Sequence, residues 1–235
     1  ERWNMSAGNL WKQGVCNLKK ILLIHNEWAR DDFGLVKGGI LPEIEEEFYH
    51  ITNLIETVSS FPDCTVQPVF YQDITPELVS QIAPDYIIAS GRAKDWDFDS
   101  IEAAYASELE LIRTTDIPFL GICAGHQLIA LAYGSRIGKL SETEEDVREM
   151  GFVDVEVDPD PLFKGLEPSV SVLMAHRDEV KALPNGFRAI GHSSMCQYAA
   201  IAHQTKPMWG VQFHPEIHTP NHQDGTQILR NFLQR

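Results

Sequence analysis

The sequence predicts a single α/β domain built on an open, mostly parallel sheet with helices on both faces. Three observations support this fold class. Short apolar runs alternate with helical stretches in the first half of the chain, and short strands separated by Pro and Gly fill the second half. The length of 235 residues suits one such domain and is short for two. We place this domain at residues 18–235 and treat residues 1–17 as an irregular segment.

The first half of the chain contains four predicted strands, each followed by a helix, and the first of these strands is expected to be buried. Pro42 and the acidic residues after it are typical of the start of a helix. Ile101, Tyr105, Leu109 and Ile112 follow one another at helical spacing. The predicted strands are Lys20–His25, Thr65–Phe70, Tyr86–Ser90 and Ile117–Ile122, and the predicted helices are Glu43–Val58, Pro76–Ile82, Phe98–Arg113 and Ala124–Ala132.

The second half changes character. Phe152–Val157 alternates apolar and acidic residues, as a half-exposed strand does. We expect the later strands to add antiparallel pairs to an otherwise parallel, flavodoxin-like sheet. The further predicted elements are strands at Val170–Ala175, Phe187–Gly191, Tyr198–His203 and Met208–Phe213 and a closing helix at Thr226–Leu233. Ligands of such sheets bind beyond the carboxyl ends of the strands, so we expect the site in the loops after Ser90, Ile122 and Phe213.

Charge and cysteine content narrow the class of protein. The formal net charge of -15 argues against a nucleic-acid or anionic-membrane partner. The acidic runs Glu43–Glu47 and Glu142–Asp146 fit a solvated surface or, alternatively, a docking face for a basic partner. The four cysteines form no Cys-x-x-Cys pair, which favours a reducing, cytoplasmic location. The chain contains no long uncharged apolar run, and its opening segment lacks the order of a secretory signal.

The segment Gly121-Ile-Cys123-Ala-Gly125 is the clearest chemical signal in the chain. An apolar strand precedes it and a helix follows at once, which is the elbow that holds a nucleophile on a tight turn. Glycine at both ends leaves room for the turn and for close strand–helix packing. The Cys123 thiol then lies at a helix N-terminus, where the dipole and a neighbouring imidazole lower a cysteine pKa from ~8.5 by one to several units. Taken alone, this motif is equally compatible with a buried, inert cysteine.

A second segment, Trp209-Gly-Val-Gln-Phe-His214-Pro-Glu216, places a histidine at the end of an apolar strand. Pro215 fixes the backbone in an extended form, and residues two apart on extended chain project to the same side. Glu216 is therefore expected to reach His214 Nδ1 and to leave Nε2 facing a thiol. One histidine near a glutamate means little among nine histidines, so the joint occurrence of this segment and the elbow supports the hypothesis.

Together, Gly121–Gln127 and Gly210–Glu216 resemble the class I glutamine amidotransferases, and the similarity runs from about Ile21 to the C-terminus. Within that family, Ala175–Asp178 and the tail His218–Phe232 look most like the glutaminase portion of GMP synthetase. The ATP-using synthetase portion is not recognised, so a complete GMP synthetase is not expected. The resemblance implies that Cys123 attacks the side-chain amide of glutamine, that His214 protonates the departing ammonia, and that water hydrolyses the resulting thioester.

The resemblance also implies an oxyanion hole. Its donors are the backbone N–H groups of Arg92, which follows Gly91, and of Ala124. Many relatives carry a second glycine where Arg92 stands, so we expect a hole that is imperfect without a partner or substrate, and a low basal turnover. Gln127 matches the position that contacts the substrate glutamine, with a helix-surface amide as the alternative.

The loop Ala175-His176-Arg177-Asp178 matches the segment that binds the substrate's α-amino and α-carboxylate groups, largely through backbone atoms. Arg177 is a candidate for the carboxylate or a solvated side chain, Asp178 a candidate for the ammonium, and His176 is expected to be structural. Four further histidines are interpreted as core or surface residues, namely His25, His50, His192 and His203. His218 and His222 are not accompanied by a convincing ligand set, so no metal and no cofactor is predicted.

Three functions are compatible with these motifs. The leading one is a glutaminase that supplies ammonia to an acceptor synthase in trans, with L-glutamine as substrate. The runner-up is a free-standing γ-glutamyl hydrolase or peptidase that uses the same three residues. The third is a regulatory binding module that keeps the fold but not the activity; the intact Cys123, His214 and Glu216 positions argue against it.

Overall fold

The structure is a computed structural model that describes residues 18–26, 42–92, 94–144 and 146–234. Side chains of residues 42–50 are not among the described parts. The segment 1–17, expected to be irregular, lies outside the described residues. The sequence-predicted α/β fold class is confirmed.

Eleven strands and six helices follow one another along the described chain. The strands are β1 (Lys19–His25), β2 (Cys64–Phe70), β3 (Tyr86–Ala89), β4 (Phe119–Ile122), β5 (Ile137–Lys139), β6 (Glu149–Val157), β7 (Ser169–His176), β8 (Asp178–Val180), β9 (Phe187–His192), β10 (Ala200–His203) and β11 (Met208–Val211). The helices are α2 (Pro42–Ser59), α3 (Pro76–Ile82), α4 (Ile101–Ala104), α5 (Ala106–Thr114), α6 (Ala124–Ala132) and α7 (Asp224–Phe232), with 3-10 turns η1 (Tyr71–Asp73) and η2 (Pro161–Phe163).

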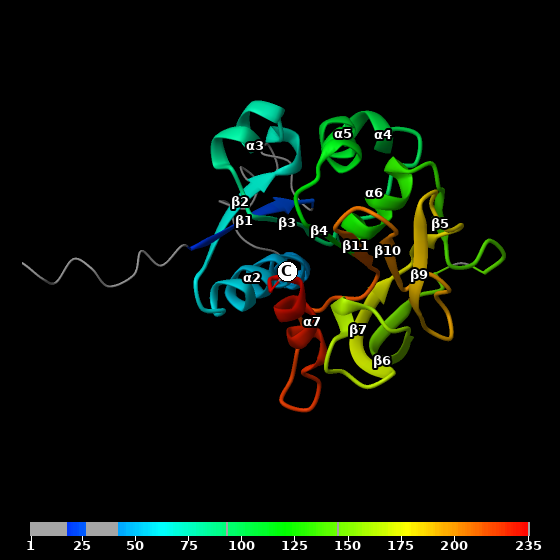
Figure 1. Cartoon of the computed structure of the whole chain (residues 1–235). Helices are drawn as coiled ribbons and strands as arrows, with labels where there is room; N and C mark the ends of the chain where they lie inside the picture. The colour runs from blue at the N-terminus through cyan, green and yellow to red at the C-terminus, as the bar shows by residue number, and fades with distance from the viewer. Residues whose placement is uncertain (1–17, 27–41, 93, 145, 235) are drawn as a thin grey trace, which may run out of the picture.

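One nine-stranded sheet organises the molecule, in the order β2-β1-β3-β4-β11-β10-β9-β6-β7 (Figure 1). The first five strands are parallel and follow the flavodoxin-like pattern, with β11 in the fifth place. The remaining neighbours pair antiparallel, as predicted for the later strands. The carboxyl ends of β3, β4 and β11 therefore lie side by side at one edge.

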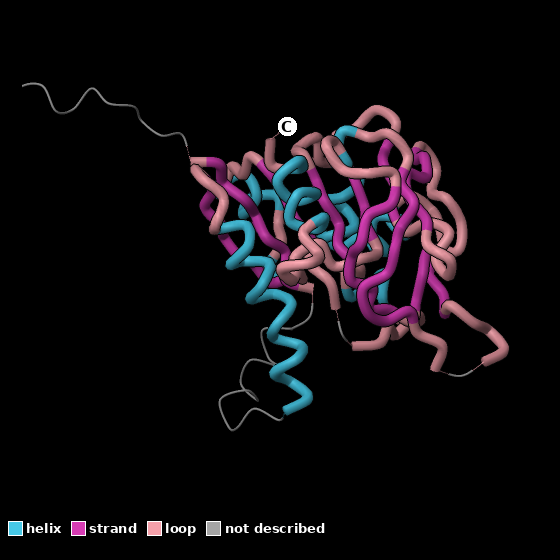
Figure 2. The backbone as a smooth tube through the Cα atoms, turned by 90° about the horizontal axis from the view of Figure 1, so that it is seen from below, coloured by secondary structure: helices cyan, strands magenta, loops and turns pink. Residues whose placement is uncertain are grey.

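Helices cover both faces of the parallel part. Ile21 and Leu23 of β1 belong to the core beneath α2 and α7, whereas Leu22 and Ile24 belong to the core beneath α3, α5 and α6. This alternation follows from the two-residue period of a strand. In Figure 1, α2 and α7 lie below the sheet and the other helices above it, and Figure 2 shows the lower face. Burial on both faces explains the uninterrupted apolar run of β1.

Two local features differ from the prediction. The helix predicted at 98–113 is broken at Tyr105, whose φ of -106° and ψ of 17° separate α4 from α5. The Tyr105 ring stacks on Tyr71 with 4.1 Å between centroids, and its hydroxyl donates to Asn26 O at 2.9 Å. These tertiary contacts accompany the break. The second feature is a separate two-stranded sheet of β5 and β8, which was not predicted because three-residue strands carry too little pattern.

Candidate active site

The turn between β4 and α6 carries Cys123 in a strained backbone conformation, with φ of 48° and ψ of -100°. Positive φ is uncommon for a residue with a side chain and is often found at functional sites. A Cβ atom on Gly121 would lie 2.5 Å from the carbonyl group of Gly125, and one on Gly125 would lie 2.5 Å from Ala89 O. Both glycines are therefore required by sterics, as the sequence predicted.

Backbone hydrogen bonds tie this elbow to its two neighbouring strands. Cys123 N–H donates to Val211 O at the end of β11, at 2.8 Å. Gly125 N–H donates to Ser90 O just after β3, at 3.2 Å. The nucleophile candidate is therefore fixed where the ends of three adjacent strands meet. Ala124 begins α6, where the first N–H groups have no partner within the helix.

His214 and Glu216 follow β11 and reach the same place. His214 Nδ1 lies 2.8 Å from Glu216 Oε1, and both side chains are almost fully buried. His214 is hydrogen-bonded to Cys123 through its side chain. A Cβ placed on Gly91 would lie 2.7 Å from His214 Cε1 and 3.4 Å from Cys123 Cβ. The imidazole and the cysteine side chain therefore meet above Gly91, which must be small for them to do so.

The electrostatics of this cluster favour a charged imidazole. Burial lowers the pKa of His214, but the Glu216 carboxylate and the hydrogen bond with Cys123 outweigh burial and raise this pKa to about 10. Among the described residues, Glu216 Oε2 has no hydrogen-bond partner. The carboxylate therefore acts mainly on His214, and an imidazolium there stabilises a neighbouring thiolate.

The loop after β3 carries Arg92, whose side chain holds the loop together. Its guanidinium donates to Tyr105 Oη at 2.7 Å and to the backbone oxygens of Lys94 and Asp95 at 2.9 and 3.2 Å. It also lies over the Trp96 ring, 5.0 Å from the centroid. An arginine thus fixes a loop in which a glycine was the expected residue.

Gln127 is buried, so the alternative of a helix-surface amide is wrong. Trp96 Nε1 donates to its Oε1 at 2.5 Å, and its Nε2 donates to Asp178 O at 2.8 Å and to Gln212 Oε1 at 3.1 Å. Both ends of the Gln127 amide are therefore engaged inside the protein. Its backbone N–H donates to Cys123 O at 3.1 Å, which ties it to the elbow.

Gln212 is a site residue that sequence reasoning missed. It is fully buried, and its Nε2 lies 3.5 Å from Cys123 Sγ. The signal was present, because Gln212 precedes His214 by two residues on extended chain and such residues project to the same side. The same alternation identified Glu216 on the other side of His214.

The segment Ala175–Asp178 lies beside this cluster. His176 is buried between Glu149 Oε2 at 2.9 Å and Asp178 O at 3.0 Å, which fits the expected structural role. Arg177 is not simply solvated, because it forms an ion pair with Asp95 at 2.7 Å. Asp178 is buried, and burial together with the Asp95 carboxylate raises its pKa. Ala175 is half-buried and pairs with β6.

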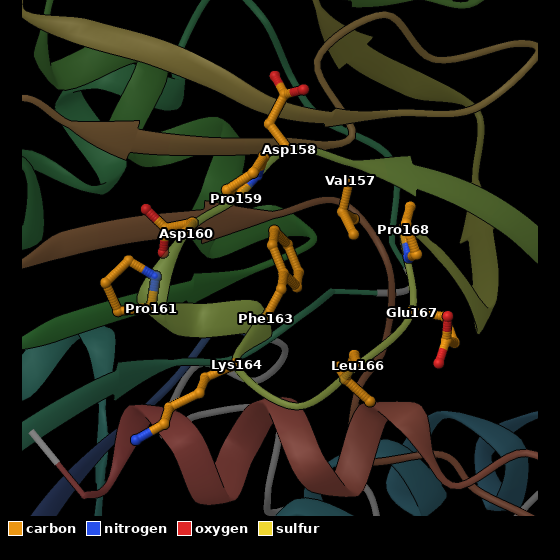
Figure 3. Close-up of a pocket in the computed structure, with 10 residues that line it drawn as sticks. All are labelled: Val157, Asp158, Pro159, Asp160, Pro161, Phe163, Lys164, Leu166, Glu167 and Pro168. Atoms are coloured by element: carbon orange, nitrogen blue, oxygen red, sulfur yellow. The ribbon is translucent and has the colours of Figure 1, made fainter.

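Two cavities flank the β6–β7 hairpin. The first, of about 320 Å³, is lined by Trp96, Arg177 and Asp178 among others and adjoins the Gln127 amide. The second, of about 610 Å³, lies at the opposite end of the hairpin, beyond Val157, with the Phe163 ring at its centre (Figure 3). Asp160 lines the larger cavity but is already bonded to Trp209 and Arg188. Of these two cavities, the smaller one is the one that adjoins Gln127 and therefore lies nearer to Cys123.

The described residues offer neither a metal-binding cluster nor a membrane-spanning helix. They contain no group of three or more His, Cys, Asp or Glu side chains placed to hold a metal ion. None of the helices in the described ranges combines the length and apolar character needed to cross a bilayer. Cys64, Cys123 and Cys196 are free thiols.

Comparisons with known proteins agree with these observations. The sequence model of the family glutamine amidotransferase class-I matches residues 47–235, most of the chain. The A subunit of GMP synthase (glutamine-hydrolyzing) from Methanocaldococcus jannaschii is 46% identical over 125 residues, 53% of this chain and 63% of that protein. The same subunit from Methanobrevibacter smithii is 44% identical over 137 residues, 57% of this chain and 67% of that protein. The chain thus spans less than two thirds of the first relative's length.

Solved structures extend the agreement to the fold. A protein of Thermoplasma acidophilum, described as a candidate A subunit of GMP synthase, is 26% identical with a TM-score of 0.71, covering 92% of this chain and 93% of that one. A glutamine amidotransferase of Thermotoga maritima, at 16% identity and a TM-score of 0.63, shares the fold over 92% of this chain and 97% of its own. The resemblance predicted from the motifs is confirmed, and this chain belongs to the class-I glutamine amidotransferase family.

Proposed function

We propose that this chain hydrolyses the side-chain amide of L-glutamine and supplies the ammonia to a separate acceptor synthase. The observation that carries the proposal is the His214 imidazole held between the Glu216 carboxylate and Cys123 on a positive-φ elbow. Cys123 is the nucleophile, His214 the acid and base, and Glu216 the residue that orients it. The relatives named as the A subunit of GMP synthase support an acceptor that makes GMP.

In the first half of the reaction the Cys123 thiolate attacks the amide carbon of glutamine. The carbonyl oxygen becomes an oxyanion, which the N–H groups of Ala124 and Arg92 stabilise. One such donor typically contributes ~2.7–4 kcal/mol to the transition state. The carbon–nitrogen bond then breaks, the nitrogen takes a proton from the His214 imidazolium and leaves as ammonia, and a γ-glutamyl thioester remains on Cys123.

In the second half, neutral His214 accepts a proton from water, and the resulting hydroxide attacks the thioester carbon. The same N–H groups stabilise the second oxyanion. The carbon–sulfur bond breaks, the thiolate departs, and glutamate is released. Cys123 is among the groups that raise the pKa of His214, and its thiolate is consumed in the thioester, so this pKa falls in the second half, where His214 acts as the base.

Substrate binding is proposed for the residues around the smaller cavity. Asp178 and Arg177, which line it, receive the α-amino and α-carboxylate groups of glutamine, with Ala175 and His176 supplying backbone contacts. Gly91 leaves room for the reacting carbonyl group, and Gln127 forms a fixed wall. Because Arg177 is paired with Asp95, substrate must displace that ion pair, which supports a low basal turnover.

The test is glutamate release from L-glutamine by the purified chain, alone and with the ATP-using subunit of a GMP synthase. We expect slow release alone and faster release with the partner, and none from Cys123→Ser under either condition. An absence of glutamate in both conditions would overturn the proposal. Faster turnover of γ-glutamyl dipeptides than of glutamine would instead support a γ-glutamyl hydrolase or peptidase.

A further inference from the structure

Three side chains form a continuous hydrogen-bonded chain from the loop after β3 to the sulfur of Cys123. Trp96 Nε1 donates to Gln127 Oε1 at 2.5 Å, and Gln127 Nε2 donates to Gln212 Oε1 at 3.1 Å. Gln212 Nε2 then lies 3.5 Å from Cys123 Sγ. Gln127 is 3% exposed and Gln212 is 0% exposed, so water does not compete for these bonds.

The chemistry of the first group in this chain fixes the direction of all the others. An indole N–H is only a donor, so the Gln127 atom that faces Trp96 must be the amide oxygen. The Asp178 carbonyl is only an acceptor and independently requires the Gln127 nitrogen on the other side. That nitrogen must meet the oxygen of Gln212, which leaves the Gln212 nitrogen facing the sulfur. Cys123 is therefore presented with a donor and not with a carbonyl oxygen.

We propose that Gln212 is a catalytic residue that stabilises the Cys123 thiolate through its Nε2–H, and that Gln127 and Trp96 are positioning residues that hold this donor in place. The proposal rests on the proposed function, because it assigns a role within that reaction. A hydrogen bond to an anion favours the charged form, and a buried setting strengthens it. Trp96 lies in the loop after β3, which also carries the Arg92 N–H group. The position of this loop is therefore coupled to the reactivity of Cys123.

The other groups that face Cys123 act differently from Gln212. His214, with Glu216 behind it, provides an imidazole whose charge depends on pH. The Cys196 thiol, between β9 and β10, interacts with Cys123, but burial raises its pKa so that it stays neutral. Gln212 does not titrate. Removing its amide therefore shifts the ionisation of Cys123 to higher pH without adding a new titration.

The test is the rate at which iodoacetamide alkylates Cys123 as a function of pH, measured on the Cys123 peptide by mass spectrometry. The full chain is used without glutamine, so the measurement does not depend on turnover. In Gln212→Leu we expect the midpoint to rise by about one pH unit, which is about tenfold less thiolate below the midpoint. An unchanged midpoint in a folded Gln212→Leu variant overturns the role of Gln212.

The second variant is Trp96→Phe, which removes the indole N–H but keeps an aromatic ring against Tyr105 and Arg92. It releases the Gln127 amide, so we expect a smaller shift of the midpoint in the same direction. Trp209→Phe is the matched control, because it removes an indole hydrogen bond to Asp160 away from this chain of amides. A shift no larger than that of the control overturns the coupling to the loop, even where Gln212→Leu fails to fold.

The measurement also separates this inference from the proposed function. In one outcome the parent chain releases no glutamate, but both variants shift the midpoint relative to the parent. This outcome refutes the proposed reaction and supports the role of Gln212 in thiolate formation. In the opposite outcome the parent chain hydrolyses glutamine, but neither variant shifts the midpoint. This outcome supports the proposed reaction and refutes the role of Gln212.

Discussion

The loops that follow β3 and β4 both border the candidate site, but different forces hold them. The loop after β4 is a turn whose shape is set by backbone hydrogen bonds and by the absence of side chains at Gly121 and Gly125. The loop after β3 is held by side chains that meet partners far away in sequence. Trp96 bonds to Gln127, 31 residues away, and Asp95 pairs with Arg177, 82 residues away.

One part of the site is therefore rigid, and the other part can respond to its surroundings. A turn with no space for side chains at Gly121 and Gly125 allows little variation in geometry, because a side chain added at either glycine must displace the backbone of the neighbouring helix or strand. The loop after β3 is held by several separate contacts, namely an ion pair, an indole hydrogen bond and the hydrogen bonds of Arg92. Loss of one contact therefore loosens this loop only in part. The proposed nucleophile, Cys123, thus lies on the rigid element, and one proposed oxyanion donor, Arg92 N–H, lies on the adjustable one.

Of the substitutions compared at one fixed pH, Gly125→Ala is expected to have the largest effect on stability. The added Cβ would lie 2.5 Å from Ala89 O and 2.8 Å from Ala89 Cβ, so α6 and β3 must separate. Overpacking of a closed core destabilises by about 1–3 kcal/mol and occasionally more, and we expect the upper end here. Denaturant unfolding gives the free energy. Gly138→Ala is the control, since its Cβ would meet the flexible Lys181 side chain at 3.1 Å; equal losses in both variants would contradict the rigid-turn interpretation.

The elements of the fold were largely predictable because they carry local patterns. The buried runs of β1, β3 and β4, and the Pro-initiated helix α3, appear where the sequence placed them. The break at Tyr105 was not predictable, because the stripe of apolar residues continues through it and the break accompanies contacts with Tyr71 and Asn26. The short signals of β5 and β8 cannot be distinguished from those of a loop.

The candidate site divides in the same way. The elbow around Cys123 and the contact between His214 and Glu216 follow from spacing alone, and the structure places them as expected. The burial of Gln127 and the clamp formed by Arg92 depend on which distant side chains meet, so one sequence could not reveal them. Gln212 was predictable only in part. Strand alternation places its side chain on the same side as that of His214, but it does not indicate that the partner is Cys123.

Gly91→Ala tests the adjustable loop at its closest approach to the cysteine and imidazole. The added Cβ would lie 2.7 Å from His214 Cε1, and a side chain yields more readily than backbone. We therefore expect a small loss of stability but a displaced imidazole. Misplacement of a catalytic group by about 1 Å lowers the rate by about 100-fold. Thermal unfolding and glutaminase kcat/KM, measured on the same sample, check this; a variant with normal kcat/KM would show that the imidazole is not constrained by Gly91.

A buried carboxyl beneath the loop after β3 gives a prediction in pH. Glu108 is fully buried, Asn26 Nδ2 donates to it at 3.4 Å, and Asn26 also bonds to Ser90. Burial raises the pKa of Glu108 to about 8, above its unfolded value, although the Asn26 bond lowers it. The folded state therefore holds the proton more tightly, so stability falls as pH rises from about 4.5 to about 8 and then levels off.

Glu108→Gln removes this fall, because an amide does not titrate. We expect the difference in Tm between variant and parent to grow in favour of the variant between pH 5 and pH 8. Between the unfolded and the folded pKa of Glu108, the parent chain loses at most about 1.4 kcal/mol of stability for each rise of one pH unit. In a chain of this size, that loss lowers Tm by several °C. Other groups titrate equally in both proteins and cancel in the difference. Parallel Tm curves would show that Glu108 is ionised at ordinary pH and that the loop tolerates its charge.

The smallest effect is expected from Asp95→Asn, which removes the ion pair between the loop and Arg177. Both partners are partly exposed, so the pair contributes only about 0.2–1 kcal/mol to stability. The Asp95 carbonyl still accepts from Arg92, so the loop keeps its shape. In the proposed reaction the freed Arg177 binds the substrate carboxylate without competition, and KM for glutamine falls by a factor of about 2 to 5 at unchanged kcat.

Asp146→Asn is the matched control for this last variant, because it removes the same charge from the rim of the same cavity without touching Arg177. If both variants lower KM equally, the effect comes from the general charge of the rim and not from release of Arg177. If Asp95→Asn instead raises KM, the ion pair holds the loop in its binding form, and the loop after β3 is as intolerant of change as the elbow after β4. Only a fall in KM confined to Asp95→Asn preserves the distinction between a rigid turn that carries the proposed nucleophile and an adjustable loop that responds to substrate.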